Sequence, residues 1–211
     1  MRSKVTLLRC RSARWAGAIA ILMLVATGGW YARLGVERAA TPGEGSAEVG
    51  FARDMSRHHQ QAVYMAILAV EHGSTSDVRQ LGNDIVLVQQ AEIGTMTAWL
   101  NNWGVPATSG GPPMAWMKHT PATTPSNGEM PGMASKDELR RLQAARGRPF
   151  DILFCQLMLR HHLGGTHMTD AILSRTRRTE VHGLASALRN TQRFEIAELT
   201  RHLDVWGARP L

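Results

Sequence analysis

Apolar residues recur at helical spacing along four long segments of the chain. The first segment runs from about Ala47 to His72, and the second runs from a cap at Ser74 or Ser76 to Gly104. The third begins near Pro149, and the fourth runs from about Thr179 to Trp206. No stretch alternates apolar and polar residues as a half-buried strand would. The pattern therefore predicts an all-α fold, a bundle of four helices of roughly 25 residues each.

Helix-boundary signals support this division. Gly73, Gly104 and Gly207 follow the last periodic residues of three segments, where helices commonly end. Residues 135–138, Ser-Lys-Asp-Glu, form a capping box that predicts a short extra helix over DELRRLQAA. Pro149 suits the first turn of the third long helix, because its missing N–H is not needed there.

One sequence pattern occurs twice, at a constant offset of 103 residues. Residues 51–104 form repeat 1 and residues 154–207 form repeat 2. The offset pairs His58–His59 with His161–His162, and it also pairs the Trp-Gly dipeptides that end the two repeats. A unit of about fifty residues cannot bury its apolar face alone. The repeats therefore predict two helical hairpins related by a pseudo-two-fold axis, joined by a Met-rich loop at 105–134.

The inward-facing stripes of the four helices carry polar residues. Each repeat offers one histidine, two methionines, a glutamine and a glutamate on converging faces, and polar groups there are costly unless they are paired or bind a metal. His59 and His162 lie one residue further round, where they can turn inward as second ligands or outward to solvent. The stripe residues are Met55, His58, Met65, Gln89 and Glu92 in repeat 1, and Met158, His161, Met168, Gln192 and Glu195 in repeat 2.

These residue types favour a site for a soft metal ion. Imidazole binds copper, zinc, iron and nickel, whereas a thioether selects soft ions, above all Cu(I). The glutamines and glutamates could accept the second ring N–H of a ligand histidine and orient it. An ordinary core also uses methionine, and a buried histidine bonded to a carboxylate is also an ordinary polar network. The duplication of the whole set favours a metal site without deciding the question.

The loop between the repeats adds further candidate metal contacts. It is rich in proline and glycine, so we expect its side chains to be exposed rather than part of a core. Exposed thioethers oxidise readily, and copper capture would give a reason for their presence. The candidates are Met114, Met117, His119, Met130 and Met133.

The N-terminus predicts export. Residues 1–14 carry five positive charges and no negative ones, and residues 15–32 form a charge-free apolar run. This arrangement is typical of a signal anchor, with a cleaved signal peptide as the alternative. Residues 33–46 would then be a tether, and the part from residue 47 onward would lie outside the cytoplasm, in the periplasm or at the cell surface, or secreted after cleavage.

The charge balance argues against nucleic acid as a partner. The whole chain has a formal net charge of +7. Without the five basic residues of the N-terminus, 19 Lys and Arg face 17 Asp and Glu, a net charge of +2. No basic run with interleaved aromatics remains. Cys10 and Cys155 would lie on opposite sides of the membrane and could not form a disulfide.

The repeated motifs resemble the DUF305 family. Repeat 1 reads M-x-x-H-H-x-x-A-x-x-M-A and repeat 2 reads M-x-x-H-H-x-G, and Q-x-x-E-I follows in each. The family comprises exported bacterial helical bundles with a ferritin-like four-helix arrangement, some of which bind copper. The resemblance covers residues 47–207. It implies that the metal-site residues are Met55, His58, His59, Met65, Met158, His161, His162 and Met168.

This chain departs from the family pattern at Gly165–Thr166 and Thr169, where alanines and the Met-Ala dipeptide are common. We therefore expect a roomier or altered site in repeat 2.

The sequence thus predicts a membrane-anchored copper-binding protein without catalytic activity. It would sequester Cu(I) or Cu(II) or hand the ion on, either to a copper-handling protein or within a homo-oligomer. One alternative is a metal-free scaffold or an interaction protein that responds to pH or stress. A ferritin-like di-metal oxidase is a weaker alternative, because such sites use Glu-x-x-His and neither repeat contains it. The nearest approach, Glu198 to His202, has the wrong spacing.

Overall fold

Every regular element in the part of the chain that the structure describes is a helix, as predicted. The structure is a computed structural model that describes residues 41–108, 110–117 and 130–211. The predicted anchor at 15–32 and the candidate ligand His119 lie outside these residues. The elements are α2 (Ala47–His72), α3 (Ser76–Asn102), the 3₁₀ turn η1 (Ala115–Met117), α4 (Lys136–Ala144), α5 (Gly147–Leu173) and α6 (Thr179–Val205).

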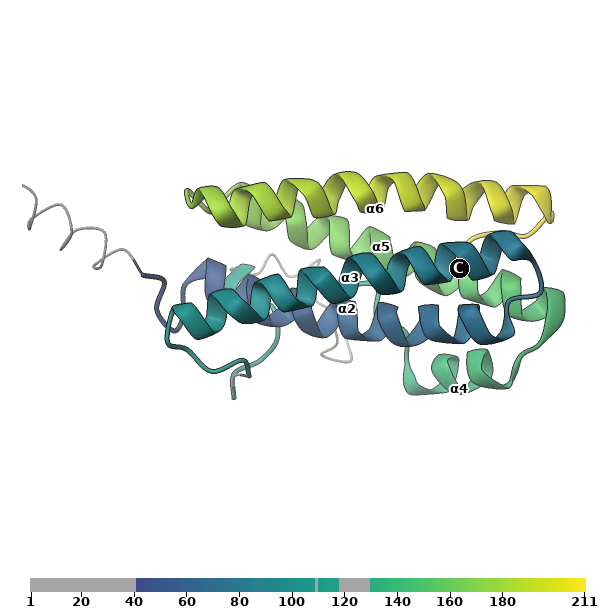
Figure 1. Cartoon of the computed structure of the whole chain (residues 1–211), viewed down its shortest axis with the longest axis horizontal. Helices are drawn as coiled ribbons and strands as arrows, with labels where there is room; N and C mark the ends of the chain where they lie inside the picture. The colour runs from purple at the N-terminus through teal and green to yellow at the C-terminus, as the bar shows by residue number, and fades with distance from the viewer. Residues whose placement is uncertain (1–40, 109, 118–129) are drawn as a thin grey trace, which may run out of the picture. The chain divides into compact units, whose positions relative to one another are not determined.

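The four long helices form the two predicted hairpins. Helix α2 packs along α3, and α5 packs along α6 (Figure 1). The hairpins meet chiefly through α2 and α5, which carry the histidine pairs, and α4 lies against both of these helices. No helix among the described residues is both long and apolar enough to cross a membrane.

The helix ends follow local hydrogen bonding, with two differences from the sequence-based expectation. The capping box is present, because the Ser135 hydroxyl accepts from the Glu138 N–H while the Glu138 carboxylate accepts from the Ser135 N–H. Helix α3 is capped by Thr75 rather than by Ser74 or Ser76. Gly73 has a φ of −56°, so it is not a left-handed cap. It is needed for space instead, since a Cβ there would lie 2.5 Å from the Ala69 carbonyl oxygen.

The buried core divides into two clusters, each with methionines from both hairpins. One contains Met65 of α2 and Met158 of α5. The other, which we call the methionine cluster, contains Met55 of α2 and Met168 of α5. It also includes Met96, Met114 and Met130, with Met117 and Met133 packed against it.

The expectation that the loop methionines are exposed is therefore wrong. Met114 is 7% exposed and Met130 is 2% exposed. The loop folds back because the Asp54 carboxylate accepts from the Met114 N–H at 2.7 Å and from the Trp116 indole N–H at 2.9 Å. Trp116 rests directly on Gly50, where any side chain would overlap its ring.

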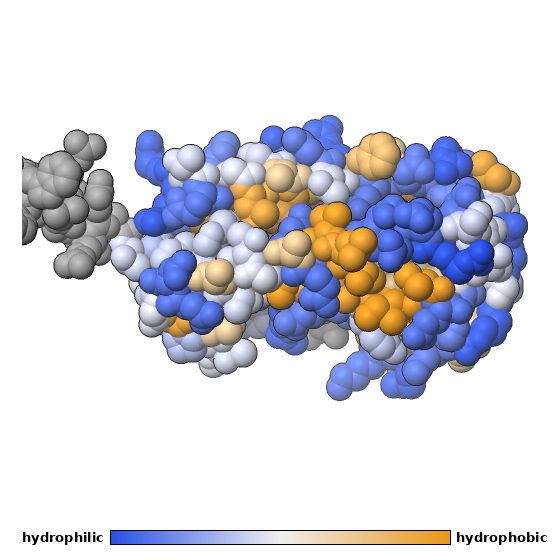
Figure 2. All heavy atoms as spheres, viewed as in Figure 1, coloured by the Kyte–Doolittle hydropathy of each residue, from blue (hydrophilic) through white to orange (hydrophobic). Residues whose placement is uncertain are grey.

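The two repeats are alike inside and different outside. Ile67 of α2 and Leu87 of α3 are exposed apolar residues, and their equivalents in repeat 2 are Asp170 and Asn190. Figure 2 shows apolar atoms gathered over α2 and α3 on the visible face. The histidine pairs of α2 and α5 and the methionines before and after them, by contrast, are buried at equivalent positions in both hairpins.

Candidate metal centre

Four histidines are buried where α2 meets α5. His58 and His161 face each other across the boundary between the hairpins, with ring centroids 3.7 Å apart and ring planes tilted by 33°. His59 and His162 are also completely buried. The structure therefore turns all four rings inward, including the two whose direction the helical spacing left open.

A glutamate holds one histidine of each pair. The Nε2 atom of His59 lies 3.0 Å from a carboxylate oxygen of Glu92 on α3. The Nε2 atom of His162 lies 2.6 Å from a carboxylate oxygen of Glu195 on α6. The two contacts are equivalent under the repeat. A carboxylate in this position fixes the orientation of the ring and the nitrogen that carries the proton.

Each of the four buried rings keeps one nitrogen without a hydrogen-bond partner among the described residues. These atoms are Nδ1 of His58, His59 and His162, and Nε2 of His161. A buried polar atom without a partner destabilises a fold unless something binds it. An imidazole that is held at one nitrogen and free at the other is the form that ligates a metal.

Burial favours the neutral form of His58, His59 and His161. It lowers the pKa of His58 and of His59 to about 3, with a further lowering from the neighbouring histidine in each case. The pKa of His161 also lies well below its usual value, first because of burial and then because of His58. Burial, helped by Glu195, raises the pKa of Glu92 to about 7. Neutral imidazole is the form that binds a metal, so no proton has to leave these three rings near pH 7.

A short segment at the end of the Met-rich loop covers the histidines. We call residues Met130–Ala134 the strap. The Pro131 carbonyl lies 3.1 Å from Nε2 of His58. The Gln61 side chain bonds both backbone groups of Ala134, at 2.7 and 2.9 Å. Gly164 of α5 allows the close approach, because a Cβ there would overlap the Pro131 carbonyl. The strap therefore separates the histidines from solvent.

The predicted extra room in repeat 2 is taken up by a side chain. A Cβ on Gly165 would overlap the amide of Gln192. Gln192 and its repeat equivalent Gln89 are both buried, and the Oε1 atom of each has no partner among the described residues. The departure at Gly165 therefore accommodates a buried amide beside the histidines.

The four predicted methionine ligands are completely buried. Along each helix one methionine precedes the histidine pair and one follows it, so sulfur atoms lie on both sides of the rings. Across the described residues, no three His, Cys, Asp or Glu side chains come together as a metal-binding group. A site built from these rings would therefore need thioether sulfur or a low coordination number.

Two parts of this arrangement were missed by reasoning from the sequence. The strap binds His58 through a backbone carbonyl, which no side-chain pattern reveals. Asp54 holds the loop through Met114 and Trp116, a role that its position in the sequence does not reveal. The Met-Pro-Gly-Met run at 130–133 was the only available signal, because a proline-glycine turn permits a close backbone approach.

Comparison with solved structures gives the same fold. One similar structure is that of a DUF305 protein from Streptomyces coelicolor, which is itself predicted to be secreted. It is 36% identical to this chain, and the match covers 79% of this chain and 98% of that protein with a TM-score of 0.73. A DUF305 fragment from Deinococcus radiodurans is 33% identical, with a TM-score of 0.63 over 75% and 95%. CopM in its Cu(II)-bound form is 25% identical, with a TM-score of 0.59 over 75% and 97%.

No protein with a curated description matches the sequence. The profile of the domain of unknown function DUF305 matches residues 48–203, which include nearly all of both hairpins and the histidine pairs of α2 and α5. The chain belongs to the DUF305 family.

Proposed function

We propose that the protein binds copper outside the cytoplasm, through the buried histidines and the methionines beside them, and that it stores the ion or hands it on. One observation carries the proposal. Each of the four buried imidazoles has a nitrogen without a hydrogen-bond partner among the described residues. In His59 and His162 the opposite nitrogen contacts a carboxylate, and in His58 it contacts a carbonyl.

The chemistry of the donors favours Cu(I). His58 and His161 offer neutral nitrogen from opposite hairpins, and Met55, Met65, Met158 and Met168 offer sulfur. Cu(I) accepts few ligands and prefers soft ones, whereas zinc would require a fuller set of nitrogen, oxygen or thiolate donors. Such a set is absent from the described residues. A protein that only stores a metal ion needs no open coordination position for a substrate. The burial of the four imidazole rings agrees with this role.

The comparisons support the proposal at the level of relatives. CopM has been solved in Cu(I)-bound, Cu(II)-bound, Ag-bound and apo forms. The sequence identity of CopM to this chain is low. The proposal that this protein also binds copper therefore rests mainly on the geometry of its buried histidines. We infer an extracytoplasmic location from the basic and apolar N-terminus. The predicted secretion of the Streptomyces protein agrees with it.

We also infer a ferritin-like four-helix bundle at residues 47–207 and an anchor at 15–32. The metal-free scaffold remains the competing function. It would use the same buried network for stability alone.

A copper titration separates the two functions. The full-length protein would be titrated with Cu(I), without oxygen, against a competing chelator of known affinity, with zinc and Fe(II) as comparison ions. We expect tight Cu(I) binding that is lost in the double variant His58→Gln/His161→Gln.

The matched control is His167→Gln/His182→Gln, which removes two exposed histidines from α5 and α6. It should bind as the unaltered protein does. Equal Cu(I) affinity in both double variants would contradict the proposed site, and no Cu(I) binding by the unaltered protein would favour the scaffold.

A further inference from the structure

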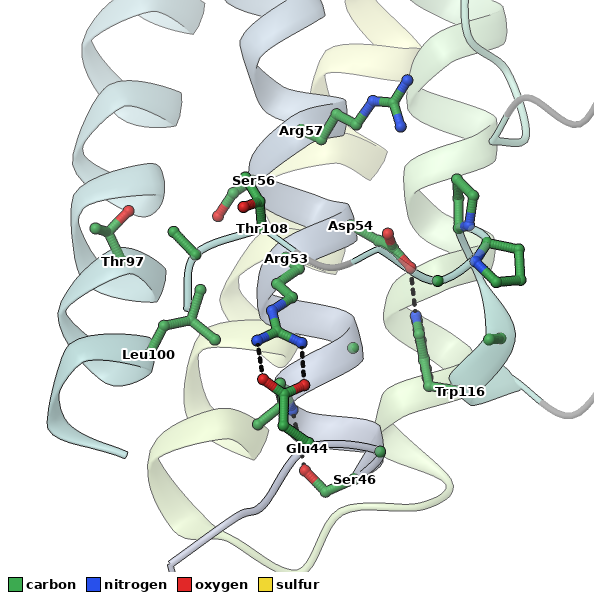
Figure 3. Close-up of a pocket in the computed structure, with 18 of the residues that line it drawn as sticks. Glu44, Ser46, Arg53, Asp54, Ser56, Arg57, Thr97, Leu100, Thr108 and Trp116 are labelled. Atoms are coloured by element: carbon green, nitrogen blue, oxygen red, sulfur yellow. Dashed lines mark hydrogen bonds and ion pairs between the residues drawn. The ribbon is translucent and has the colours of Figure 1, made fainter. Parts of the chain in front are cut away.

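A cleft near the start of α2 has no role in the copper site. It has a volume of about 510 Å³ and lies between the first half of α2, the end of α3 and the segment that contains η1. This volume falls within the range of small-molecule sites. Val49, Leu100 and Trp116 form apolar walls, and Arg53 and Arg57 supply positive charge (Figure 3).

Arg53 is fixed by a backbone contact and forms an ion pair with the Glu44 carboxylate. Its side chain is 9% exposed, and its Nε donates to the Pro106 carbonyl at 2.8 Å. Its two terminal nitrogens donate to both carboxylate oxygens of Glu44, each at 2.6 Å. The Glu44 side chain is 61% exposed. The bond from Nε to the Pro106 carbonyl therefore fixes the guanidinium, while the exposed Glu44 carboxylate can leave its terminal nitrogens with little loss of packing.

Arg57 has no ion-pair or hydrogen-bond partner among the described residues, although it lines the same cleft. Figure 3 shows its guanidinium turned away from the pair of Arg53 and Glu44. The nearby Asp54 does not neutralise it through a contact, because the Asp54 carboxylate bonds Met114 and Trp116. The cleft therefore contains one unpaired guanidinium and one that is paired with an exposed carboxylate.

The repeat provides an internal comparison. The equivalent of Arg57 in repeat 2 is Arg160. Its two terminal nitrogens donate to the two carboxylate oxygens of Glu138, at 2.9 and 2.8 Å. These bonds are the first cause that lowers the pKa of Glu138 to about 2. An arginine at this place in the hairpin thus binds a carboxylate in repeat 2, whereas in repeat 1 it is exposed at the edge of the cleft, where its side chain must turn inward to reach a ligand.

We propose that the cleft binds a small organic carboxylate, with Arg57 as its anchor and Glu44 as an internal competitor for Arg53. A second carboxylate on the ligand would displace Glu44 and take the fork of Arg53. The apolar walls would contact the carbon skeleton. This proposal is independent of copper binding, because none of the candidate metal ligands lines the cleft.

Calorimetric titration of the copper-free, full-length protein tests the proposal. The probes are succinate and benzoate, with succinamide and benzamide as neutral counterparts of the same shape. We expect saturable binding of at least one carboxylate and none of its amide. Arg57→Gln should weaken binding about tenfold, the loss expected for a charged hydrogen-bonded contact. Glu44→Gln should strengthen succinate binding, because it removes the competitor.

The control Arg177→Gln removes an exposed positive charge from the segment between α5 and α6. It should leave the affinity unchanged, and circular dichroism should show equal helix content in all variants. Equal binding of acids and amides, or an Arg57→Gln variant that binds like Arg177→Gln, would overturn the proposal. So would the absence of saturable binding with both acids.

Discussion

The rings of His58 and His161 lie against each other across the boundary between the two hairpins, with centroids 3.7 Å apart. Both side chains are buried, and each keeps one nitrogen without a partner among the described residues. Two neutral imidazoles in this position lower the free energy of unfolding when their nitrogens have no partner, and a metal ion bound between them would raise it. Stability should therefore report on metal binding.

Cu(I) should raise the melting temperature of the protein. A ligand present at a thousand times its dissociation constant stabilises the folded state by about 4 kcal/mol, which corresponds to a rise of roughly 10 °C for a domain of this size. Thermal unfolding followed by circular dichroism, without oxygen, measures the rise. His58→Gln/His161→Gln should lose most of it. A rise of the same size in that variant would place the bound ion elsewhere.

Acid should destabilise the copper-free protein. The pKa values of His58 and His59 are about 3 in the folded state, below the ordinary value of 6.5. The unfolded chain therefore binds more protons, and stability falls as the pH drops from about 6.5 toward 3, by up to about 1.4 kcal/mol per pH unit for each histidine. The raised pKa of Glu92 acts in the opposite sense, because the folded state keeps that proton as the pH rises from about 4.5 to 7.

Among the residues of the candidate site, three histidines have lowered pKa values and one glutamate has a raised pKa, so the net effect of acid at this site is a loss of stability. Urea unfolding at pH 7.5, 6 and 5 measures it. The variant His58→Gln should show a shallower dependence on pH. A midpoint that does not change between pH 7.5 and 5 would contradict the neutral burial of these rings.

Gly165→Ala should destabilise the fold through Gln192. The new methyl group would overlap the buried amide, and forced repacking of this kind costs about 1–3 kcal/mol. Gly183→Ala on α6 is the matched control, since a Cβ there meets no neighbouring atom. It should be neutral or stabilising by up to about 1 kcal/mol, because alanine favours helix. Equal unfolding midpoints for the two variants would show that Gln192 moves aside freely.

Gln61→Ala should loosen the strap. It leaves the N–H and carbonyl of Ala134 without their bonds to the amide, at a cost of about 1–3 kcal/mol. We expect faster hydrogen exchange at residues 132–134 and faster Cu(I) uptake by stopped-flow mixing. Gln60→Ala, an exposed neighbour on the same helix, is the control. If Gln61→Ala exchanged faster but took up copper at the unaltered rate, the metal would enter by another route.

The helices of the described residues could be predicted largely from the sequence, because their determinants are local. Helical spacing placed the four long helices within a few residues, and the capping box at Ser135 gave the start of α4. The offset between the repeats identified the residues that face inward, since both copies bury the same positions. Prediction was weakest at single caps such as Thr75, where neighbouring hydroxyls compete for one N–H.

The surroundings of the site could not be predicted, because they depend on contacts between distant segments. Composition suggested that the loop was exposed. The bonds from Asp54 to Met114 and Trp116 instead hold this part of the loop against the bundle, where Met114 is buried. The contact of His58 with the Pro131 carbonyl involves a backbone atom, which leaves no pattern in the side chains. Helical periodicity describes one helix at a time and contains no information on such contacts.

The placement of His58 and His161 on separate hairpins has a consequence for the release of copper under the proposed function. Each ring belongs to a different half of the duplicated unit, so the pair exists only while α2 and α5 remain docked. A force, protease or acceptor protein that parts the halves would dismantle the binding pair in a single step. Under the proposed function, loss of the ion and separation of the two hairpins would therefore be coupled.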